Sequence, residues 1–249
     1  MKLTTHWFQE LVASQYRCRL AQSSEDLNQA QMLRFQVFNL ELEEGLEQAY
    51  ATGRDEDPFD SICDHLIVED HLSGQIIGTY RLQSGITAQN GLGYYSEQEF
   101  NFTSYEPIRQ EILELGRACI HKSHRNLASL GLLWKGIAQY AKHYKLRYFI
   151  GCSSLTSQDP AVGLEVYRML EKRFGALPHL RTIPRPEYAC KSDQTPDVTP
   201  NIPKLLRAYL TVGAHICGPP ALDNAFGTID FLTLLDLHNL SARNLRRYF

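Results

Sequence analysis

Apolar residues recur at helical spacing near the start of the chain, which predicts an amphipathic helix over residues 25–43. Ser23 and Asp26 stand three residues apart before this stretch, and that spacing is typical of a capping box at a helix start. Gly45 is a typical stop signal at the other end. The apolar stripe that would face the core consists of Leu27, Ala30, Leu33, Val37 and Leu40.

Runs of β-branched and other apolar residues predict five strands, of which the first two form a hairpin. Residues 62–69 and 75–82 are joined by a short polar turn that contains Gly74, so we expect them to pair in antiparallel fashion. Three further strands are expected over residues 112–120, 147–155 and 228–237.

Three more helices are expected between and after these strands. They cover residues 128–144, 160–174 and 203–212, and the second begins at a proline, which the first turn of a helix tolerates. Residues 178–203 hold six of the eleven prolines and are expected to be irregular. The order of helices and strands predicts an α/β or α+β fold with a mixed sheet and no evident domain boundary.

Composition places the chain among ordinary globular proteins. It has 249 residues, 43% hydrophobic and 21% charged, with a formal net charge of −3. This balance argues against a nucleic-acid partner, which would need a clustered basic excess. A continuous apolar run of the roughly 18 residues that span a bilayer is missing, so we expect a cytoplasmic protein. The basic and aromatic tail, residues 239–249, has two interpretations: a solvated end, or a transient contact with anionic lipid at the inner membrane face.

The sequence offers little for metal binding or disulfides. The six cysteines are scattered without a C-x-x-C pair, which is typical of reduced thiols. His121 and His124 lie three residues apart, but no third ligand stands near them, so no metal site is expected.

One predicted strand, residues 112–120, carries a carboxylate and a guanidinium in an otherwise apolar run. Glu114 and Arg117 are an odd number of residues apart, so a regular strand would point them to opposite faces. A bulge near Gly116 would change that. Two interpretations remain open, an ion pair at a sheet edge and a charged pair that lines a cleft.

A second charged feature is the acidic segment at residues 54–60. It is either a solvated loop or a recognition surface for a cationic substrate such as an amine. Arg34 and Arg81 lie in apolar surroundings, and each is either a surface residue or an anchor for one of these acids.

The linear order of these residues resembles a known family. Arg34-Phe-Gln-Val-Phe38, Asp57-Pro-Phe-Asp60, a hairpin that ends at Arg81-Leu82, and Glu114-Leu-Gly-Arg117 follow one another as in the autoinducer-synthase-like branch of the GNAT N-acyltransferases. Within it, the chain is most similar to the ornithine N-acyltransferases that make lyso-ornithine lipid. Further similar segments are residues 117–125, 132–137, 228–232 and 213–223, the last with its Cys-Gly-Pro-Pro.

The resemblance covers residues 25–238 and implies a single GNAT-like domain with a mixed, mostly antiparallel sheet flanked by helices. Residues 1–24 would be an N-terminal extension, and residues 239–249 the tail. The implied reaction moves a fatty or 3-hydroxyfatty acyl group from acyl-carrier protein to the α-amine of ornithine. The donor is an acyl-phosphopantetheine thioester, and no cofactor is bound. The alternatives are acylation of glycine or another amino acid, autoinducer synthesis, and a GNAT-fold binding protein without catalysis.

The resemblance also implies roles for particular residues. Glu114 would be the general base, and Tyr167 the general acid that protonates the departing thiolate. Backbone N–H groups around Ala118 would stabilise the oxyanion.

The acceptor would be held by the charged residues that precede this strand. Asp57 and Asp60 would bind its cationic group. Arg34 and Arg81 would either order the acidic loop or bind the acceptor carboxylate.

The donor would contact Arg117, Ala118 and the segment at residues 125–131. CoA-dependent GNAT enzymes hold the pyrophosphate in a loop of the form Q/R-x-x-G-x-G/A, with backbone N–H groups around the phosphates. In this segment, which ends at Gly131, only Arg125 and the small residue Ala128 correspond to that loop, and Gly131 is the remaining candidate for donor contact. A carrier-bound phosphopantetheine has a single phosphodiester, so the reduced loop favours a carrier protein over CoA.

Overall fold

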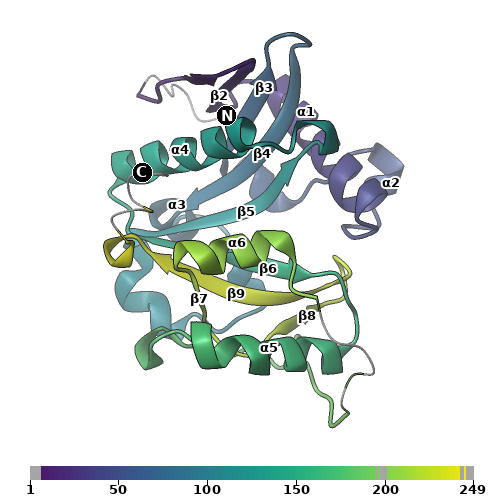
Figure 1. Cartoon of the computed structure of the whole chain (residues 1–249), viewed down its shortest axis with the longest axis vertical. Coiled ribbons are helices and arrows are strands. Elements are labelled where there is room, and N and C mark those ends of the chain that lie inside the picture. The colour runs from purple at the N-terminus through teal and green to yellow at the C-terminus, as the bar shows by residue number, and fades with distance from the viewer. Residues whose placement is uncertain (1–6, 195, 197–200, 242–243, 245–249) are drawn as a thin grey trace.

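The computed structural model describes residues 7–194, 196, 201–241 and 244, and over these residues nine strands form one sheet (Figure 1). The strand order is β1-β2-β3-β4-β5-β6-β9-β7, with β8 paired to β9. Among the described pairings only that of β5 with β6 is parallel. The strands are β1 Leu11–Ala13, β2 Tyr16–Leu20, β3 Asp64–Asp70, β4 Gln75–Ser84, β5 Ile112–Ile120, β6 Tyr148–Leu155, β7 His215–Ile216, β8 Ala221–Asp223 and β9 Thr228–Asp236.

Six α-helices and several short helical turns accompany the sheet in the described part of the chain. The α-helices are α1 Ser24–Phe35, α2 Ala49–Thr52, α3 Gly85–Gln89, α4 Leu127–Tyr144, α5 Pro160–Phe174 and α6 Lys204–Val212. A π-helix, η1 Gln36–Glu41, continues α1. The 3₁₀ turns are η2 Pro58–Ser61, η3 Tyr95–Gln98, η4 Thr103–Glu111, η5 Lys122–His124, η6 Pro178–Leu180 and η7 Leu237–Asn239.

The long helices and strands confirm the elements that the hydrophobic pattern predicted. The capping box at Ser23 and Asp26 begins α1, and the predicted helix over 25–43 is present as α1 and η1. The hairpin of β3 and β4, the strand β5 and the helices α4, α5 and α6 lie within a few residues of their predicted bounds. The predicted α/β fold with a mostly antiparallel sheet is therefore confirmed.

The sequence pattern missed the strands before residue 25. Residues 11–20, which we expected in an extension, form β1 and β2, and β2 pairs with β3 along its whole length. We did not predict β2 because its charged residues Arg17 and Arg19 interrupt the apolar pattern. In the structure they alternate with buried residues and pair with Glu69 and Asp26. Part of the expected C-terminal tail, residues 242–243 and 245–249, lies outside the described residues.

Helices cover the sheet on both faces. Leu66 and Val68 of β3 pack with α4, whereas Ile67 between them packs with α1 on the opposite face. In Figure 1, α4 crosses the half of the sheet formed by β1–β5, and α5 and α6 accompany the half formed by β6–β9. The two halves meet at β5 and β6.

The contact between β5 and β6 is short, and this shapes the site. The two strands pair only from Ile112 to Glu114 and from Tyr148 to Ile150. Just beyond, Gly151 lies so close to β5 that a Cβ on it would overlap the carbonyl oxygen of Leu115. The strands therefore touch at one end of β5 and diverge toward its other end.

A bulge in β5 reorients the strand after Gly116, the position at which the sequence left this possibility open. Gly116 pairs with Arg81 and Cys119 with Thr79, so two residues of β5 lie opposite the single residue Tyr80. Arg117 occupies the bulge with a left-handed φ of 51°. As a result Glu114 and Arg117 face the same side, where both lie against Tyr95.

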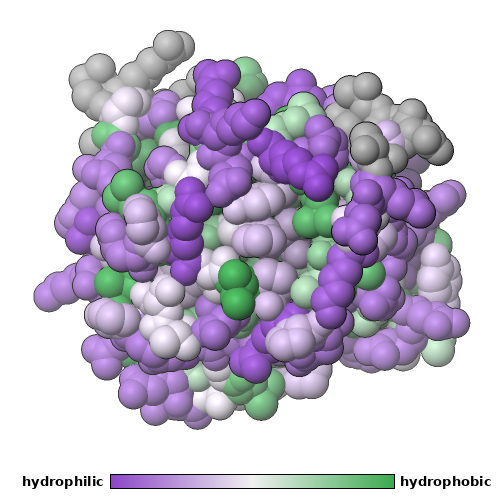
Figure 2. Space-filling model, turned by 90° about the horizontal axis from the view of Figure 1, so that it is seen from below, coloured by the Kyte–Doolittle hydropathy of each residue, from purple (hydrophilic) through white to green (hydrophobic). Residues whose placement is uncertain are grey.

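The described helices include none that is both long and apolar enough to cross a lipid bilayer. Figure 2 shows the face seen from below, which is mostly hydrophilic, with hydrophobic residues in small separate areas.

We predict that Gly151→Ala destabilises the fold by about 1–3 kcal/mol, because the added methyl group would force β6 away from Leu115. The control is Gly131→Ala in α4, where an added Cβ meets no atom within 4 Å. That change should raise stability slightly, by up to about 1 kcal/mol, through helix propensity. Urea unfolding of both variants measures the difference, and equal midpoints would contradict the close approach of the two strands.

Candidate functional site

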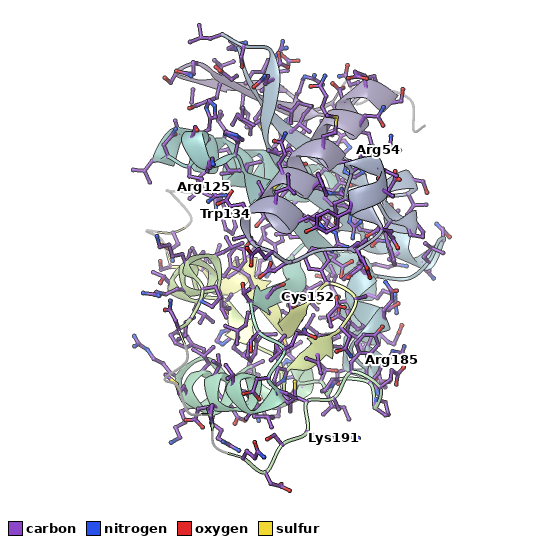
Figure 3. The ribbon with its side chains drawn as sticks, turned by 90° about the vertical axis from the view of Figure 1, so that its right-hand side faces the viewer. Arg54, Arg125, Trp134, Cys152, Arg185 and Lys191 are labelled. Atoms are coloured by element: carbon purple, nitrogen blue, oxygen red, sulfur yellow. The ribbon has the colours of Figure 1, made fainter. Side chains whose placement is uncertain are left out.

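A cavity of about 760 Å³ lies where β5 and β6 diverge. It is lined by α4 and α6 on one face of the sheet, and on the other by residues around η3 and β8. Figure 3 shows Cys152 of β6 near the middle of the molecule, with Trp134 and Arg125 above it. The cavity therefore connects both faces of the sheet through the gap between the two strands.

The part of the cavity next to α4 and α6 is apolar. Its wall consists of Leu130, Leu133, Trp134, Leu205, Tyr209 and Leu235. The hydroxyl groups of Tyr80 and Tyr209 hydrogen-bond to each other, so these two polar atoms are satisfied within the wall. Such a chamber suits a hydrocarbon chain, because burial of apolar surface provides the binding energy.

Glu114 lies on the opposite side of the gap and lines the cavity. Its carboxylate accepts hydrogen bonds from the backbone N–H of Tyr95 (2.7 Å), the backbone N–H of Ser96 (2.9 Å) and the Ser96 hydroxyl. The residue is only 5% exposed, and this burial raises the pKa of Glu114 in spite of the hydrogen bonds that favour the charged form. A fixed carboxylate with a raised pKa is suited to accept a proton near neutral pH.

Arg34 holds the acidic loop and is itself fully buried, with an exposed fraction of 0%. Its guanidinium donates to Asp55 at 2.6 Å and to Asp60 at 2.9 and 2.7 Å. The burial of Asp60 raises its pKa, but Arg34 and Arg81 outweigh this effect and lower the pKa below its ordinary value. Arg34 thus contacts two acids of the loop and does not line the cavity, which favours the first of its two expected roles, the ordering of the loop.

The same loop is held by two arginines of the central strands. Arg81 contacts Asp57 at 2.6 Å and Asp60 at 3.1 Å, and Arg117 contacts Asp57 at 3.1 Å and Asp55 at 3.3 Å. The rings of Tyr95 and Phe226 flank Arg117 at 4.8 and 4.6 Å. We call Arg34, Arg81, Arg117, Asp55, Asp57 and Asp60 the arginine–aspartate network.

Asp57 and Asp60, which we expected to bind the cationic group of the acceptor, belong to this network. Both carboxylates are buried against arginines, and neither lines the cavity. Three guanidinium groups already balance the three carboxylates, so a further cation would meet no net negative charge there. These contacts favour the interpretation of the acidic loop as a structural element of the site.

Tyr167 also lies in a different place from the one expected for a general acid. It sits on α5 and packs against the hydrophobic cluster of Leu155, Val166 and neighbouring residues, and it does not line the cavity. Burial and a hydrogen bond with Glu171 raise the pKa of Tyr167 to about 12. The helical position predicted from the sequence is correct, but the helix turns this side chain away from the gap.

Only some of the residues predicted to bind the acyl donor line the cavity. Arg117, Ala118 and Arg125 line the cavity, whereas Ala128 and Gly131 do not. Arg125 lies at the cavity mouth, and its guanidinium is paired with Glu41.

The backbone N–H groups at the start of α4 already have hydrogen-bond acceptors. The N–H groups of Ala128 and Ser129 both donate to the Asn126 side chain, at 3.0 and 3.1 Å. This helix end therefore has fewer N–H groups to offer a phosphate than an uncapped one.

Sequence analysis missed a second group of acids on the Glu114 side of the sheet. One ligand atom each of Glu99, Cys152 and Asp230 lies within 4.8 Å of the others, and Asp223 lies close by. Burial raises the pKa of Asp230 to about 6 and, together with the charges of Asp230 and Asp223, that of Glu99 well above its ordinary value. Asp230 could be noticed as a charge within an apolar strand, but Glu99 stands in a loop without any motif.

Among the described residues, Glu99, Cys152 and Asp230 form the group whose ligand atoms lie close enough to one another to hold a metal ion. The pair considered from the sequence, His121 and His124, has ring centroids 5.6 Å apart but is not part of such a set. All six cysteines are free thiols, as expected.

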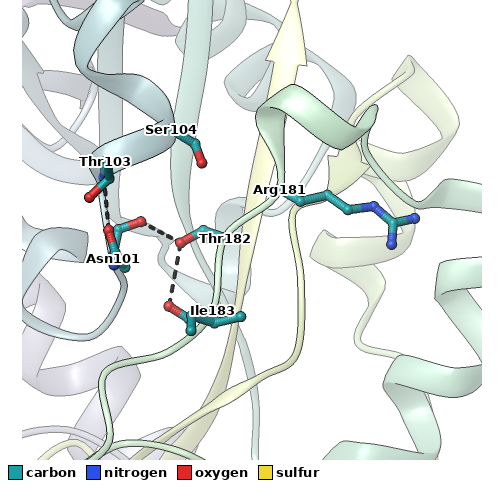
Figure 4. Close-up of a pocket in the computed structure, with 6 residues that line it drawn as sticks. All are labelled: Asn101, Thr103, Ser104, Arg181, Thr182 and Ile183. Carbon is teal, nitrogen blue, oxygen red and sulfur yellow. Dashed lines mark hydrogen bonds between the residues drawn. The ribbon is translucent and has the colours of Figure 1, made fainter.

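A smaller hollow of about 220 Å³ lies near Asn101 and Thr182 (Figure 4). Its polar groups bond to one another, and the Arg181 side chain points away from it. Arg181 donates instead to Ala176 and Glu171. This hollow offers little chemistry, so the cavity at the strand gap is the candidate site.

Comparison with known proteins supports an acyltransferase. Residues 33–135 match the acetyltransferase (GNAT) domain family. The chain is 33% identical over 245 residues to the L-ornithine N(alpha)-acyltransferase of Brucella abortus, a match that covers 92% of this chain and 87% of that protein. It is 30% identical over 245 residues to the protein of the same name from Agrobacterium fabrum, covering 92% and 84% of the two chains.

Solved structures share the fold at low sequence identity. The N-acyl amino acid synthase FeeM from uncultured soil microbes matches with a TM-score of 0.55 and 9% identity, over 90% of this chain and 91% of that one. The AHL synthase LasI matches with a TM-score of 0.52 and 12% identity, over 95% and 96%. The resemblance of the sequence to a GNAT-like fold is therefore confirmed.

We predict that Arg34→Met lowers the free energy of unfolding by about 3–5 kcal/mol, because it removes the buried guanidinium that contacts both Asp55 and Asp60 and leaves their charges undercompensated. The control is Arg168→Met, which removes an exposed pair with Glu165 and should cost about 1 kcal/mol or less. Urea unfolding of the two variants measures this contrast, and a similar small loss in both would contradict a structural role for Arg34.

The cost of Arg34→Met should depend on pH. The pairing lowers the pKa of Asp60 in the folded protein, so its stabilising effect is present above the unfolded value of roughly 4 and is lost as the pH falls. The stability difference between wild type and variant should narrow as the pH falls below about 5, toward the lowered pKa of Asp60 in the folded protein. A difference that widens in acid would contradict the ion pairing.

Proposed function

Because the chain belongs to the L-ornithine N(alpha)-acyltransferase family, we propose that it transfers a fatty acyl group from a thioester to the α-amine of ornithine. The observation that carries this proposal is the position of Glu114. It is a buried carboxylate with a raised pKa, and it lines a cavity that has an apolar chamber on one side and acidic groups on the other. The carboxylate, the apolar chamber and the acidic groups together suit a reaction that joins a hydrocarbon chain to a cationic amine.

The apolar chamber is the proposed site of the acyl chain. It lies between α4 and α6, and its volume continues through the gap to Glu114. The thioester would enter past Arg125 at the start of α4 and place its carbonyl carbon in the gap. The (3-hydroxy)acyl chain would then point toward Trp134 and Tyr209.

We propose acyl-carrier protein as the source of the thioester. The N–H groups of Ala128 and Ser129 are bonded to Asn126, and the Arg125 guanidinium is paired with Glu41. A CoA pyrophosphate would have to displace these contacts, whereas the single phosphodiester of a carrier-bound phosphopantetheine needs fewer donors.

Glu114 is the proposed general base. An α-amine has a pKa of roughly 8, so most of it carries a proton at neutral pH and cannot attack. Glu114, directly or through a water molecule, takes a proton from the ammonium. The amine nitrogen then attacks the thioester carbon, and the C–S bond breaks as the amide forms. Of the two protons that the ammonium loses, one goes to the departing sulfur and the other to solvent.

The transition state carries negative charge on the former carbonyl oxygen. Beyond Glu114, the edge of β5 that faces β6 has no strand pairing among the described residues. Backbone N–H groups of this edge, around Ala118 in the bulge, are the proposed oxyanion donors. The bulge at Arg117 turns the backbone here, and Asp55 and Asp57 hold that turn in place.

We predict that the purified chain forms N-acylornithine from ornithine and a 3-hydroxyacyl carrier protein, faster than from the corresponding acyl-CoA. Mass spectrometry of reactions with each donor and a panel of amino acids measures the product. If the enzyme acylates glycine or S-adenosylmethionine faster than ornithine, ornithine is not its acceptor. If the acyl-CoA reacts as fast as the acyl-carrier protein, the proposed preference for the carrier protein is wrong. Absence of any acylated product would contradict an acyltransferase.

We predict that Glu114→Gln lowers kcat by about 10²–10⁴-fold, because the amide cannot accept the proton. The control is Glu111→Gln, at an exposed position just before the same strand, which should keep near-normal turnover. Steady-state kinetics with both variants measures the effect, and circular dichroism checks that each is folded. Near-normal turnover of folded Glu114→Gln would remove Glu114 from the base role.

A further inference from the structure

We propose that Glu99 and Asp230, supported by Asp223, bind the side-chain ammonium group of the acceptor amino acid. This inference rests on the proposed function and adds to it the part of the site that selects a diamino acid. The three residues come from the end of η3, from β9 and from β8, and they converge on Cys152 of β6. Asp223, Asp230 and Cys152 line the cavity, and Glu99, which is not part of its lining, is reached through Cys152, whose thiol donates to it.

The geometry of this group is compact. A carboxylate oxygen of Glu99, one of Asp230 and the Cys152 sulfur all lie within 4.8 Å of one another. The Cys152 thiol donates to Glu99 Oε2 at 3.6 Å. A single small cation between the two carboxylates could therefore contact both.

The hydrogen bonds around the group are incomplete in one specific place. Glu99 is 2% exposed, yet its Oε1 has no hydrogen-bond partner among the residues that the structure describes. Asp230 Oδ1 accepts from the Thr228 hydroxyl at 3.1 Å, and Asp223 Oδ2 from the Tyr95 hydroxyl at 3.4 Å. A buried carboxylate oxygen without a donor is costly, and a ligand that brings N–H groups would satisfy it.

The charge balance points to a cation. The Arg117 guanidinium contributes a lowering of the pKa of both Glu99 and Asp230, but it is bound to Asp55 and Asp57. In the arginine–aspartate network the charges already cancel, so three acids remain on this side of the cavity without a cation of their own. A positively charged ligand would lower the cost of their burial.

The distance to the reacting centre matches the length of an amino-acid side chain. The Cα of Glu114 pairs with that of Ile150, and Cys152 lies two residues further along β6 on the same face. Two strand residues span roughly 7 Å. The two nitrogens of ornithine are separated by five bonds, which amounts to roughly 6 Å when the chain is extended. An α-amine at Glu114 therefore places the terminal ammonium beside Glu99 and Asp230.

The chemistry of the group favours an ammonium over a metal ion. An ammonium has three N–H donors and no acceptor, which suits a site made of carboxylate oxygens. Burial and the neighbouring Glu99 raise the pKa of Cys152 well above its usual range, so in the ligand-free protein its sulfur is a neutral thiol that donates to Glu99.

The test compares ornithine with norvaline, which has the same carbon chain but no terminal amine. Calorimetry measures the dissociation constant of each ligand for the full chain, with and without holo-carrier protein. Wild type should bind ornithine about 10–100-fold more tightly than norvaline, the range expected for hydrogen bonds to a charged group. Glu99→Gln and Asp230→Asn should remove most of this preference and leave norvaline binding unchanged.

The control variant is Glu106→Gln, whose side chain is exposed and bonded to Arg109 outside the cavity. It should keep the preference for ornithine. Norvaline binding by each variant shows that the cavity is folded. If Asp230→Asn does not fold, Glu99→Gln and the wild-type comparison of the two ligands still decide the result.

Three results would overturn the inference: equal affinity of wild type for ornithine and norvaline, an equal loss for both ligands in the variants, or a preference that chelation removes and Mn²⁺ or Zn²⁺ restores. Acylation assays separate this inference from the proposed function. Formation of N-acylornithine without a binding preference contradicts the ammonium site alone. A preference for ornithine without any acylated product contradicts the proposed reaction and leaves the ammonium site supported.

Discussion

The arginine–aspartate network is the interaction on which the rest of the site depends. Arg34, Arg81 and Arg117 lie in the protein interior, where an unpaired charge would be costly, and each is matched by carboxylates of one short loop. The network ties α1, β4 and β5 to the loop before β3. It also holds Arg117 in the left-handed conformation of the bulge, which a non-glycine residue adopts only where its surroundings require it.

The bulge and the divergence of β5 from β6 together build the cavity. Three residues of pairing keep the two halves of the sheet in contact, and beyond them the backbone edge of β5 is open to a ligand. The same gap connects an apolar chamber under α4 and α6 with the polar face that carries Glu114. A thioester and an amine can thus approach one carboxylate from opposite sides of the sheet, which agrees with an N-acyltransferase.

The acids of the site fall into two sets with different environments. Asp55, Asp57 and Asp60 are neutralised by arginines, and the pKa values of Asp57 and Asp60 are lowered. Glu99, Asp230 and Glu114 lack such partners, and burial raises their pKa values. The first set is paired within the structure, and for the second set we propose proton transfer and recognition of a cation. Counting acidic residues in the sequence cannot separate them, because the difference lies in which arginines they touch.

The local elements and the residues that carry the family resemblance could be predicted from the sequence alone. The capping box at Ser23, the alternation in β3 and β4 and the apolar run with a charged pair in β5 all depend on neighbours within a few residues, so their patterns are readable. The pairing of Asp57 and Asp60 with arginines, the position of Tyr167 outside the cavity lining and the contact between Glu99 and Asp230 required the folded chain. These outcomes depend on residues up to 131 positions apart, and on how burial and pairing change a charge, which no local pattern encodes.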